Sequence, residues 1–346
     1  MRAAVLYGPM DLRIEEIPLP EIGADDVLIK VKVCGICGSD YHYWKHGRAG
    51  AFVINRPLVL GHEFSGIVEE VGESVTTLER GDRVVVEPGV PCRKCGYCRS
   101  GRYNLCPHMR FMGSAQAMVN GAFAEYVASP YDFVYKMPAG MTFEEGAMIE
   151  PLSVALWAVS RSGVSPASSA VVFGVGPIGS LVLEVMRAVG VTRIYAVDVD
   201  DWRLDFATRL GALATFNPER EEVVRGIMEV TGGEGVDVVV EASGAEMASR
   251  QAVEVVKRGG VLVLVGMYAQ RMFPYPLLDI VVKELDVRGV FRYANMFPVG
   301  IELVSKGMVN VRQLVTHTFP FEEIERAFRL IDERRENFMK VQVRIN

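Results

Sequence analysis

Short apolar runs separated by turn-forming residues dominate residues 1 to about 150 of the chain. Segments rich in Val and Ile lie at 27–35, 64–72 and 82–89, and Gly, Pro and Asp punctuate the sequence between them. Such runs predict strands, because β-branched side chains fit a pleated, half-buried surface. Few long helical patterns precede Phe143. We therefore expect a β-rich, loop-rich region here.

From Pro151 onward, buried apolar runs alternate with amphipathic segments. Short apolar runs bounded by glycine predict strands, whereas apolar positions that recur every three to four residues predict helices. Buried strands that alternate with helices are typical of a doubly wound parallel sheet. We predict strands at 170–176, 193–200, 235–244, 261–266 and 286–293, and helices at 178–190, 202–211 and 247–260.

The segment after Tyr293 no longer shows the regular alternation of strands and helices, and we assign it to the first region. It contains a helical pattern near 297–306 and a closing strand pattern, KVQVRI, at 340–345. We therefore predict an α/β chain with two domains. Residues 1–152 and 293–346 form the β-rich domain, and residues 153–292 form the doubly wound domain with a parallel sheet.

Composition and charge narrow the possible classes of function. A chain of 346 residues, 50% hydrophobic and 23% charged, can form two folded domains. The formal net charge of −6 and the absence of a basic stripe argue against a nucleic-acid partner. The N-terminus lacks a signal-peptide pattern, and no apolar run approaches the roughly 20 residues needed to span a bilayer. Six cysteines, four of them clustered, suit metal binding in a reducing cytoplasm better than a disulfide framework.

The stretch from Cys37 to Glu63 carries a candidate catalytic metal site. Cys37, His62 and Glu63 supply a thiolate, an imidazole and a carboxylate, which are ligand types that zinc accepts. Three protein ligands leave one coordination position open, as a catalytic zinc requires. Two alternatives stay open at this point. Cys34 and Cys37 form a C-x2-C pair that also suits a redox dithiol, and a His-Glu dipeptide is common on protein surfaces.

A second cysteine cluster predicts a structural metal within a lobe at about 90–108. Cys92, Cys95, Cys98 and Cys106 are spaced C-x2-C-x2-C-x7-C. Four thiolates at short spacing close a tetrahedral zinc with no open position, so this zinc takes no part in chemistry. An iron–sulfur cluster and free cysteines are the alternatives, and the spacing differs from that of ferredoxins.

A glycine-rich turn predicts a dinucleotide site. Gly174, Gly176 and Gly179 fit G-x-G-x-x-G between a predicted strand and a predicted helix, where backbone N–H groups can face a pyrophosphate. Asp198 ends the next strand, at the spacing at which a carboxylate binds ribose hydroxyls and repels a 2′-phosphate. NAD is therefore favoured over NADP. Arg203 can instead accept such a phosphate, although we expect it near the adenine, and an ordinary strand-to-helix turn is the other alternative.

Motifs along nearly the whole chain resemble those of the zinc-dependent medium-chain alcohol dehydrogenases, and within them those of the polyol (sorbitol/xylitol) dehydrogenases. The resemblance implies a β-rich catalytic domain related to the chaperonin-10 fold, a Rossmann domain that binds NAD, and a cleft between them. It also implies a cytoplasmic dimer or tetramer. The motifs are GICGSDYHYW, PLVLGHEFSG, GDRVVVEPG, GRYNLC, TFEEGAMIEPLSVALWA, GVGPIG, GVFRYANMFPV and LVTHTFP.

The resemblance also assigns roles to residues. Cys37, His62 and Glu63 match the catalytic zinc ligands, and Glu150 matches a further ligand of some relatives that contacts the zinc-bound water and substrate in polyol enzymes. Whether Glu63 or Glu150 binds the zinc directly stays open. The matched substrate-binding positions are Tyr43, Glu150, Arg292 and Tyr293, and the matched NAD contacts are Gly174, Gly176, Pro177, Ile178, Gly179, Asp198, Arg203, Val265, Gly266, Met267, Val290, Phe291 and Arg292.

The implied reaction oxidises a secondary alcohol of a polyol to a ketose and transfers hydride to NAD. Zinc would polarise the hydroxyl oxygen and lower its pKa, as it lowers that of bound water to about 7. Ser39 and His42 follow Cys37 and can pass the released proton to solvent. Alternatively, Ser39 only caps a helix and His42 is merely exposed. Asp40 can cap the helix, orient His62, or both.

Two other functions stay open at this stage. An L-threonine or 2,3-butanediol dehydrogenase would share every zinc and NAD feature, and only the resemblance of VFRYANMFP favours a polyol. A non-enzymatic stabiliser that kept the fold is a different class of function. The intact metal ligands argue against it.

Overall fold

The computed structural model describes residues 1–346, and its backbone forms two compact units. The first unit comprises Met1–Glu150 and Phe297–Asn346, and the second comprises Pro151–Met296. The chain therefore leaves the first unit, builds the second and returns to the first. None of its helices combines the length and the apolar character needed to cross a bilayer.

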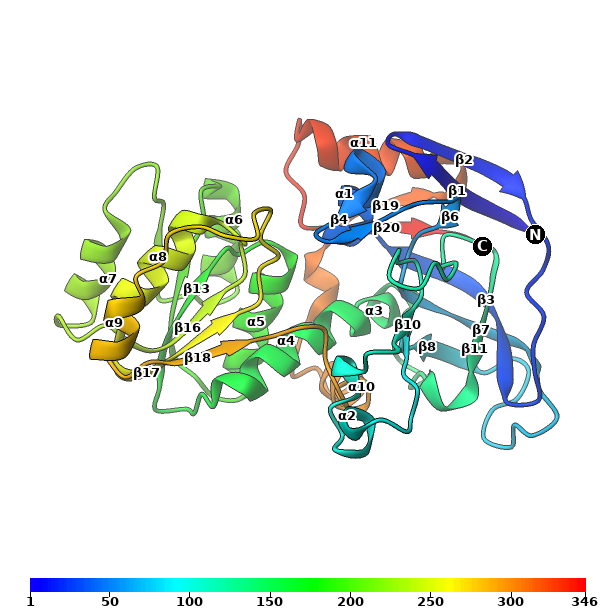
Figure 1. Ribbon diagram of the computed structural model, residues 1–346, viewed down its shortest axis with the longest axis horizontal. Coiled ribbons are helices and arrows are strands. Elements are labelled where there is room, and N and C mark those ends of the chain that lie inside the picture. The colour runs from blue at the N-terminus through cyan, green and yellow to red at the C-terminus, as the bar shows by residue number, and fades with distance from the viewer. The chain divides into compact units, whose positions relative to one another are not determined.

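β-structure predominates in the first unit (Figure 1). Its strands are β1 (Arg2–Gly8), β2 (Asp11–Glu16), β3 (Asp26–Gly35), β4 (Arg48–Ala49), β5 (Phe52–Val53), β6 (Leu58–Val59), β7 (Glu63–Val71), β8 (Arg83–Val86), β9 (Gly89–Val90), β10 (Arg110–Phe111), β11 (Tyr126–Pro130), β12 (Val134–Lys136), β19 (Val315–Pro320) and β20 (Lys340–Arg344). Its helices are α1 (Gly38–His46), α2 (Gly96–Arg99), α3 (Phe143–Ala147), α10 (Phe297–Ser305) and α11 (Ile324–Glu333).

Strand β3 is the centre of the largest sheet of this unit. The sheet has the order β12-β8-β7-β3-β20-β19, and β11 also pairs with β3. At one end of β3, Gly35 lies opposite Glu63 on β7 and opposite Gln342 on β20. Segments far apart in the sequence therefore meet at this end of the sheet.

Aromatic packing holds helix α1 in place. Trp44 of α1 stacks on Phe328 of α11 with ring centroids 5.5 Å apart, and Phe123 packs edge-on against Phe328 at 5.9 Å. All three side chains are completely buried. Since burial of one large apolar side chain contributes roughly 1.5–3 kcal/mol, this cluster fixes the helix whose first turn follows Cys37.

The second unit is a six-stranded parallel sheet with the order β15-β14-β13-β16-β17-β18. The order reverses between β13 and β16, and ligands of such sheets bind at the carboxyl ends of the strands at this switch point. Its strands are β13 (Ser169–Phe173), β14 (Arg193–Val197), β15 (Ala214–Phe216), β16 (Val236–Glu241), β17 (Val256–Leu264) and β18 (Asp286–Gly289). Its helices are α4 (Ile149–Ser162, whose first two residues belong to the first unit), α5 (Pro177–Ala188), α6 (Asp201–Arg209), α7 (Val223–Val230), α8 (Glu246–Val255) and α9 (Leu277–Val282).

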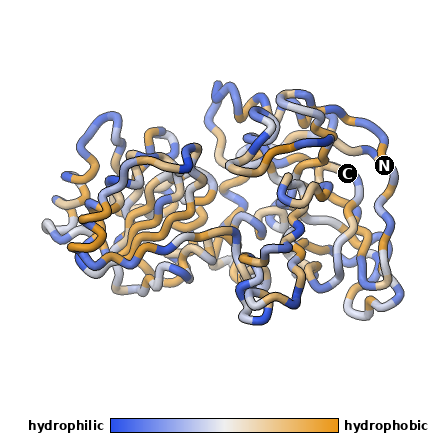
Figure 2. Tube along the Cα trace, in the orientation of Figure 1, coloured by the Kyte–Doolittle hydropathy of each residue, from blue (hydrophilic) through white to orange (hydrophobic).

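Helices cover both faces of this sheet, as predicted. Helices α7, α8 and α9 contact one another in that order and lie on one face (Figure 1). Because parallel crossovers are right-handed, α5 lies on the other face, since the chain moves in the opposite direction across the sheet there. The sheet strands form an apolar band in Figure 2. The predicted fold class, a β-rich domain with a doubly wound α/β domain, is confirmed.

Two predicted boundaries were wrong. The strand predicted at 286–293 ends at Gly289, because Arg292 adopts a φ of 54°, a left-handed conformation that interrupts an extended strand. The helix predicted at 247–260 ends at Val255, where the backbone becomes extended and β17 begins. The sequence patterns also missed α4, α7, α9 and β15, three of which are short.

The connection from β6 to β7 turns at Gly61, directly before His62. Gly61 has a φ of 92°, and a Cβ there would lie 2.8 Å from Cys34 Sγ and 3.0 Å from the Phe123 ring. Gly81 has a similar φ of 96° but has open space around it. The two glycines therefore share the backbone conformation and differ in crowding.

We expect Gly61→Ala to lower the free energy of unfolding by about 3 kcal/mol or more, because left-handed strain adds to overpacking. Gly81→Ala, the matched control, introduces the backbone strain without overpacking and should lower the free energy of unfolding by about 1 kcal/mol. Urea denaturation of both variants measures the difference. Equal losses would show that the tight packing around Gly61 contributes nothing to stability.

Candidate metal centre and nucleotide site

Three potential metal ligands converge at the end of β3. Cys37 directly precedes α1, His62 lies between β6 and β7, and Glu63 is the first residue of β7. One ligand atom from each lies within 4.8 Å of those of the other two. His62 and Glu63 are buried, whereas Cys37 is partly accessible. The arrangement provides sulfur, nitrogen and oxygen donors, and the sulfur belongs to the partly accessible residue of the three.

Asp40 both caps α1 and faces His62. Its Oδ2 accepts a hydrogen bond from Cys37 N at 3.0 Å, and its Oδ1 accepts one from Gly61 N at 3.3 Å. The same Oδ1 lies 3.5 Å from His62 Nδ1. A carboxylate beside a ligating imidazole fixes the ring orientation and raises its basicity. Asp40 is thus placed for both of the roles that the sequence left open.

The donor set fits a bound cation. Burial alone would lower the pKa of His62, but Asp40 and the Cys37 thiolate outweigh it and raise that pKa well above its usual value. In addition, the Glu63 carboxylate is buried and forms an ion pair with Lys340, so an acidic oxygen is held beside the sulfur and the imidazole. Cys37, His62 and Glu63 are therefore suited to hold zinc.

Sequence patterns missed Lys340, which lies beside this cluster. Its ammonium forms an ion pair with Glu63 Oε2, and both side chains are almost completely buried. Burial lowers the pKa of Lys340, but Glu63, Cys37 and Glu150 raise it above its usual value, so the group stays charged. The only signal was a lysine at the start of the KVQVR strand, where alternation with valine suggested a solvent-facing side chain.

Glu150 is buried in the first turn of α4. It is not among the three residues whose donor atoms cluster within 4.8 Å of one another. Its charge nevertheless acts on Lys340 and on Glu87. Burial, with a smaller contribution from Glu150, raises the pKa of Glu87 to about 7 against the hydrogen bonds from Tyr103 and Tyr135. A direct Glu150–zinc bond stays a prediction.

The other predicted residues of this region lie on α1. Ser39 is half-buried and His42 is exposed, one turn from the Cys37 end of the helix. Burial, with a smaller contribution from His46, lowers the pKa of His42. Tyr43 is buried, and its hydroxyl lies 3.3 Å from Ser114 Oγ and accepts a hydrogen bond from Ala115 N. Their proton-relay and substrate roles stay predictions.

The four-cysteine lobe brings its sulfur atoms together. Cys92, Cys95, Cys98 and Cys106 each offer a sulfur within 4.8 Å of the other three. None forms a disulfide. Backbone N–H groups of Lys94 and Cys95 lower the pKa of the Cys92 thiol to about 6, which favours the thiolate that a metal binds. The cluster has the donor set of a closed, structural zinc site.

The glycine-rich turn lies at the switch point of the second unit, after β13. Gly174 has a φ of 80°, and a Cβ there would lie 2.6 Å from Ser243. Pro177 is the first residue of α5, where the missing N–H costs nothing. Ile178 and Gly179 follow it in the first turn of α5, and Gly179 packs directly against Gly174. The helix N-terminus is thus free to face an anion.

Asp198 is bound to the glycine-rich turn. Its Oδ2 accepts a hydrogen bond from Val175 N at 2.8 Å, and its Oδ1 accepts one from Asp200 N at 3.1 Å. Each carboxylate oxygen retains a second lone pair for a ligand hydroxyl. Arg203 reaches back over the turn, where its Nη1 would lie 3.4 Å from a Cβ on Gly176. The guanidinium is therefore beside the turn itself.

The remaining predicted nucleotide contacts follow β17 and β18. Val265 N and Gly266 N donate hydrogen bonds to Glu241 O at 2.8 and 3.0 Å, and Val290 N donates to Leu264 O at 2.9 Å. Met267, Phe291 and Arg292 continue these segments, and the Arg292 guanidinium lies 4.7 Å from the Phe291 ring centre. Tyr293 is buried in the same unit.

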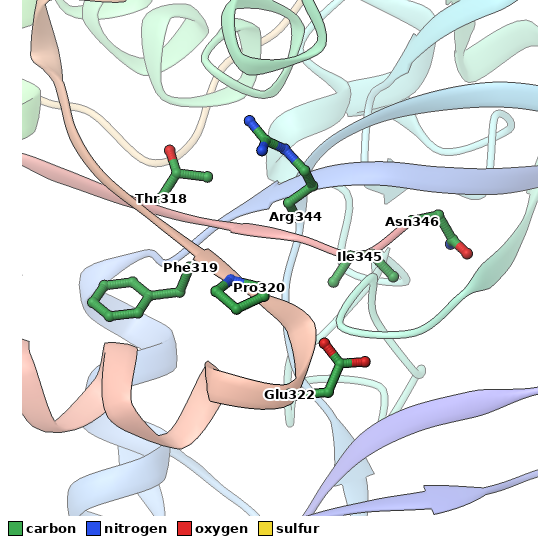
Figure 3. Close-up of a pocket in the computed structure, with 7 residues that line it drawn as sticks. All are labelled: Thr318, Phe319, Pro320, Glu322, Arg344, Ile345 and Asn346. Atoms are coloured by element: carbon green, nitrogen blue, oxygen red, sulfur yellow. The ribbon is translucent and has the colours of Figure 1, made fainter.

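A surface pocket of the first unit lies apart from these residues. Thr318, Phe319, Pro320, Glu322, Arg344, Ile345 and Asn346 line it (Figure 3). No predicted metal ligand is among them. The pocket therefore belongs to the strand ends of β19 and β20 and carries no candidate chemistry.

Comparisons with known proteins agree with this geometry. Residues 23–139 match the alcohol dehydrogenase GroES-like domain family, and residues 177–306 match the zinc-binding dehydrogenase family. The chain is 45% identical over 330 residues to D-xylulose reductase A of Aspergillus niger, covering 94% of this chain and 91% of that protein. It is 39% identical over 343 residues to sorbitol dehydrogenase of Bacillus subtilis, covering 99% and 97%. The crystal structure of 2R,3R-butanediol dehydrogenase from Bacillus subtilis superimposes with a TM-score of 0.90 at 37% identity, covering 100% and 99% of the two chains.

We expect elemental analysis to find about two zinc ions per chain, one for each donor cluster. Cys37→Ser and Cys98→Ser should each lower the content to about one, because each removes a ligand from a different cluster. Cys34→Ala removes a buried thiol outside both clusters and serves as the matched control, which should retain two. A single zinc in the unaltered protein would contradict one of the two assignments.

Proposed function

The chain belongs to the zinc-dependent medium-chain alcohol dehydrogenase family, and on that basis we propose that it oxidises a secondary alcohol of a sugar alcohol to a ketose, with NAD as the hydride acceptor. It is an oxidoreductase with a GroES-like and a Rossmann domain. The polyol assignment draws its support from the similarity to D-xylulose reductase and sorbitol dehydrogenase along more than nine-tenths of the chain.

The single observation that carries the proposal is the convergence of the donor atoms of Cys37, His62 and Glu63, of which Cys37 is partly accessible. Zinc bound there would supply a Lewis acid for an alcohol oxygen, with a coordination position left for it. Cys37, His62 and Glu63 would hold such a metal. Asp40 orients His62 and thereby keeps the ligand geometry fixed.

The chain also provides groups to move the proton that alcohol oxidation releases. We assign this relay to Ser39 and His42, which follow Cys37 on α1 and of which Ser39 is half-buried and His42 exposed. The lowered pKa of His42 keeps its imidazole neutral, and hence able to accept a proton, near neutral pH. His42 then releases the proton to solvent.

Residues that bind a polyhydroxylated substrate must offer several hydrogen-bond donors and acceptors. We assign this role to Tyr43, Glu150, Arg292 and Tyr293, which the family resemblance places at substrate positions. Guanidinium and phenol groups suit vicinal hydroxyls because they present donors at fixed angles. Tyr43 is already held by Ser114 and Ala115, so its position is defined before a substrate binds.

For the cofactor we propose NAD, bound at the carboxyl ends of β13 and β14. The glycine-rich turn and the N-terminus of α5 would face its pyrophosphate, while Asp198 would bind the adenosine ribose. We assign Val265–Met267 and Val290–Arg292 to the nicotinamide end. The charge of Asp198 next to the turn supports NAD over NADP, and Arg203 beside Gly176 is placed for the pyrophosphate or adenine.

A vicinal diol such as 2,3-butanediol is the second candidate substrate. The similarity to 2R,3R-butanediol dehydrogenase supports it, since that structure covers the whole chain at 37% identity. L-threonine belongs to the same group of candidates. These substrates share the secondary alcohol and differ in the number of hydroxyls to be bound.

We further propose that the protein works in the cytoplasm as a homo-oligomer, with a tetramer as the expected form. The six cysteines are free thiols, which suits a reducing compartment. In the second unit, Leu277, Leu278 and Val281 of α9 are each at least two-thirds exposed, next to the edge strand β18. Apolar groups beside a sheet edge are usually covered by another chain. A second copy of this chain suits this surface.

Asp198→Ala should weaken NAD binding by about tenfold or more, equivalent to about 1.4 kcal/mol, while NADP binding changes less. The variant loses the acceptor for the ribose hydroxyl and also the charge that repels a 2′-phosphate. Asp205→Ala removes an exposed carboxylate on the nearby helix α6; it is the matched control and should leave both affinities unchanged. Titration with each reduced cofactor measures the ratio; an unaltered ratio would contradict the assignment of Asp198.

A panel of sugar alcohols, 2,3-butanediol and L-threonine, each with NAD and NADP, tests the proposed substrate class. We expect NADH formation to be fastest with a sugar alcohol and to stop in Cys37→Ser and His62→Ala, which keep the cofactor residues intact. Binding of NAD to these variants provides the control for folding. The absence of turnover with every sugar alcohol would exclude the polyol assignment.

A further inference from the structure

Lys340 is the only lysine or arginine of the chain that is fully buried, and it pairs with a predicted metal ligand. We propose that Lys340 is a positioning residue that competes with the catalytic metal for the carboxylate of Glu63, which makes Glu63 the ligand that can leave the metal. The inference rests on the zinc site of the proposed function. It adds Lys340, which lies outside that ligand set, and states that Lys340 weakens the bond between Glu63 and the metal.

The backbone brings Glu63 and Lys340 together from two strands on either side of β3. Glu63 begins β7, Lys340 begins β20, and β3 runs between these two strands. Gly35 of β3 lies opposite Glu63, and a Cβ there would overlap Glu63 Oε2 and lie 3.1 Å from Lys340 Cε. The missing side chain of Gly35 thus creates the space in which the carboxylate and the ammonium meet.

The ammonium of Lys340 already acts on the Glu63 carboxylate. It forms a close ion pair with Glu63 Oε2. Glu63 also supplies the oxygen that clusters with the donor atoms of Cys37 and His62. A metal and an ammonium group therefore act on one carboxylate. Each weakens the hold of the other, because a carboxylate that shares its charge with one cation attracts a second less strongly.

Because of this geometry, Lys340 should contribute differently to the stability of the metal-free protein and of the zinc-loaded protein. In the metal-free protein, Lys340 forms the buried ion pair with Glu63 Oε2, so its loss leaves that carboxylate without its lysine partner. In the zinc-loaded protein, the charge of the metal would compensate much of the negative charge of Glu63, so the loss of Lys340 should matter less. A residue that merely ties β20 to β7 would contribute equally in both states.

The test uses the full chain and compares Lys340→Met, Glu63→Gln and the double variant, each as zinc-loaded and as chelator-treated protein. Lys136→Met removes a half-exposed lysine that pairs with Asp82 in the same unit and is the matched control. Thermal unfolding gives the midpoint of each form. A chromogenic chelator gives the rates of zinc release, and the phase that is missing in Cys37→Ser belongs to the open site.

In the metal-free form, Lys340→Met should lower the unfolding midpoint by about 5 °C or more, and the double variant should recover much of that loss because it buries no unpaired charge. In the zinc-loaded form the loss should be less than about half as large. Zinc should leave the open site of Lys340→Met about tenfold more slowly, since Glu63 then binds the metal without competition. Lys136→Met should show none of these changes.

Equal losses in both metal states together with an unchanged release rate would overturn the proposal, as would faster release. If Lys340→Met does not fold but the double variant does, the unpaired carboxylate is the cause, as proposed. If neither folds, Lys340 is a structural residue and the proposal fails. Failure of the proposed function is separate, because it would appear as missing zinc at the Cys37 site or missing polyol turnover in the unaltered protein.

Discussion

Negatively charged metal ligands can be buried in a β-sheet only if positive charge or N–H donors lie beside them. An unpaired buried ion costs several kcal/mol, even after the surrounding protein has relaxed. The first unit buries Asp40, Glu63 and Glu150 close to a thiol. Asp40 is compensated by the backbone N–H groups of Cys37 and Gly61. Glu63 has the ammonium of Lys340, and the remaining negative charge makes the site one that attracts a divalent cation.

The second unit uses a different source of positive potential at the turn where we propose that the pyrophosphate binds. At the turn after β13, backbone N–H groups at the start of α5 supply positive potential, with the Arg203 guanidinium beside Gly176 and without a lysine in the motif. Asp198 holds the turn by its bond to Val175 N, so one carboxylate both shapes the backbone and supports selection of the ribose. Peptide dipoles are fixed in direction, whereas side-chain charges such as Lys340 can be shared between partners.

This difference explains which parts of the two sites could be predicted from the sequence. The glycine-rich turn and the two cysteine clusters depend on residues that are close together in the chain, so their spacing shows their geometry. Lys340 lies in a strand whose K-V-Q-V-R alternation is typical of a half-exposed strand, but Lys340 and Gln342 are both buried. Gln342 donates a hydrogen bond to Glu144 O of helix α3, which packs on β3 and β7 of the same sheet. Tertiary packing overrode the pattern.

The fold was predictable to a similar extent. Alternating apolar runs identified β13, β14, β16 and β17 with their order in the chain, because buried parallel strands are almost continuously apolar. The end of β18 was not predictable, since a left-handed Arg292 depends on its surroundings and not on its own preference. Likewise, α9 exposes much of its apolar surface, so its pattern lacks the polar face that marks a surface helix.

The position of Lys340 also connects the chemistry with the topology of the chain. The first unit is discontinuous, because Pro151–Met296 is inserted between Glu150 and Phe297. The cation that balances Glu63 therefore comes from β20, on the far side of the insertion, and reaches the site only after β20 pairs with β3. Contacts so distant in sequence form late, because the entropy of loop closure must be overcome first. Until that pairing forms, Glu63 lacks its buried partner, so assembly of the sheet and completion of the metal site are one event.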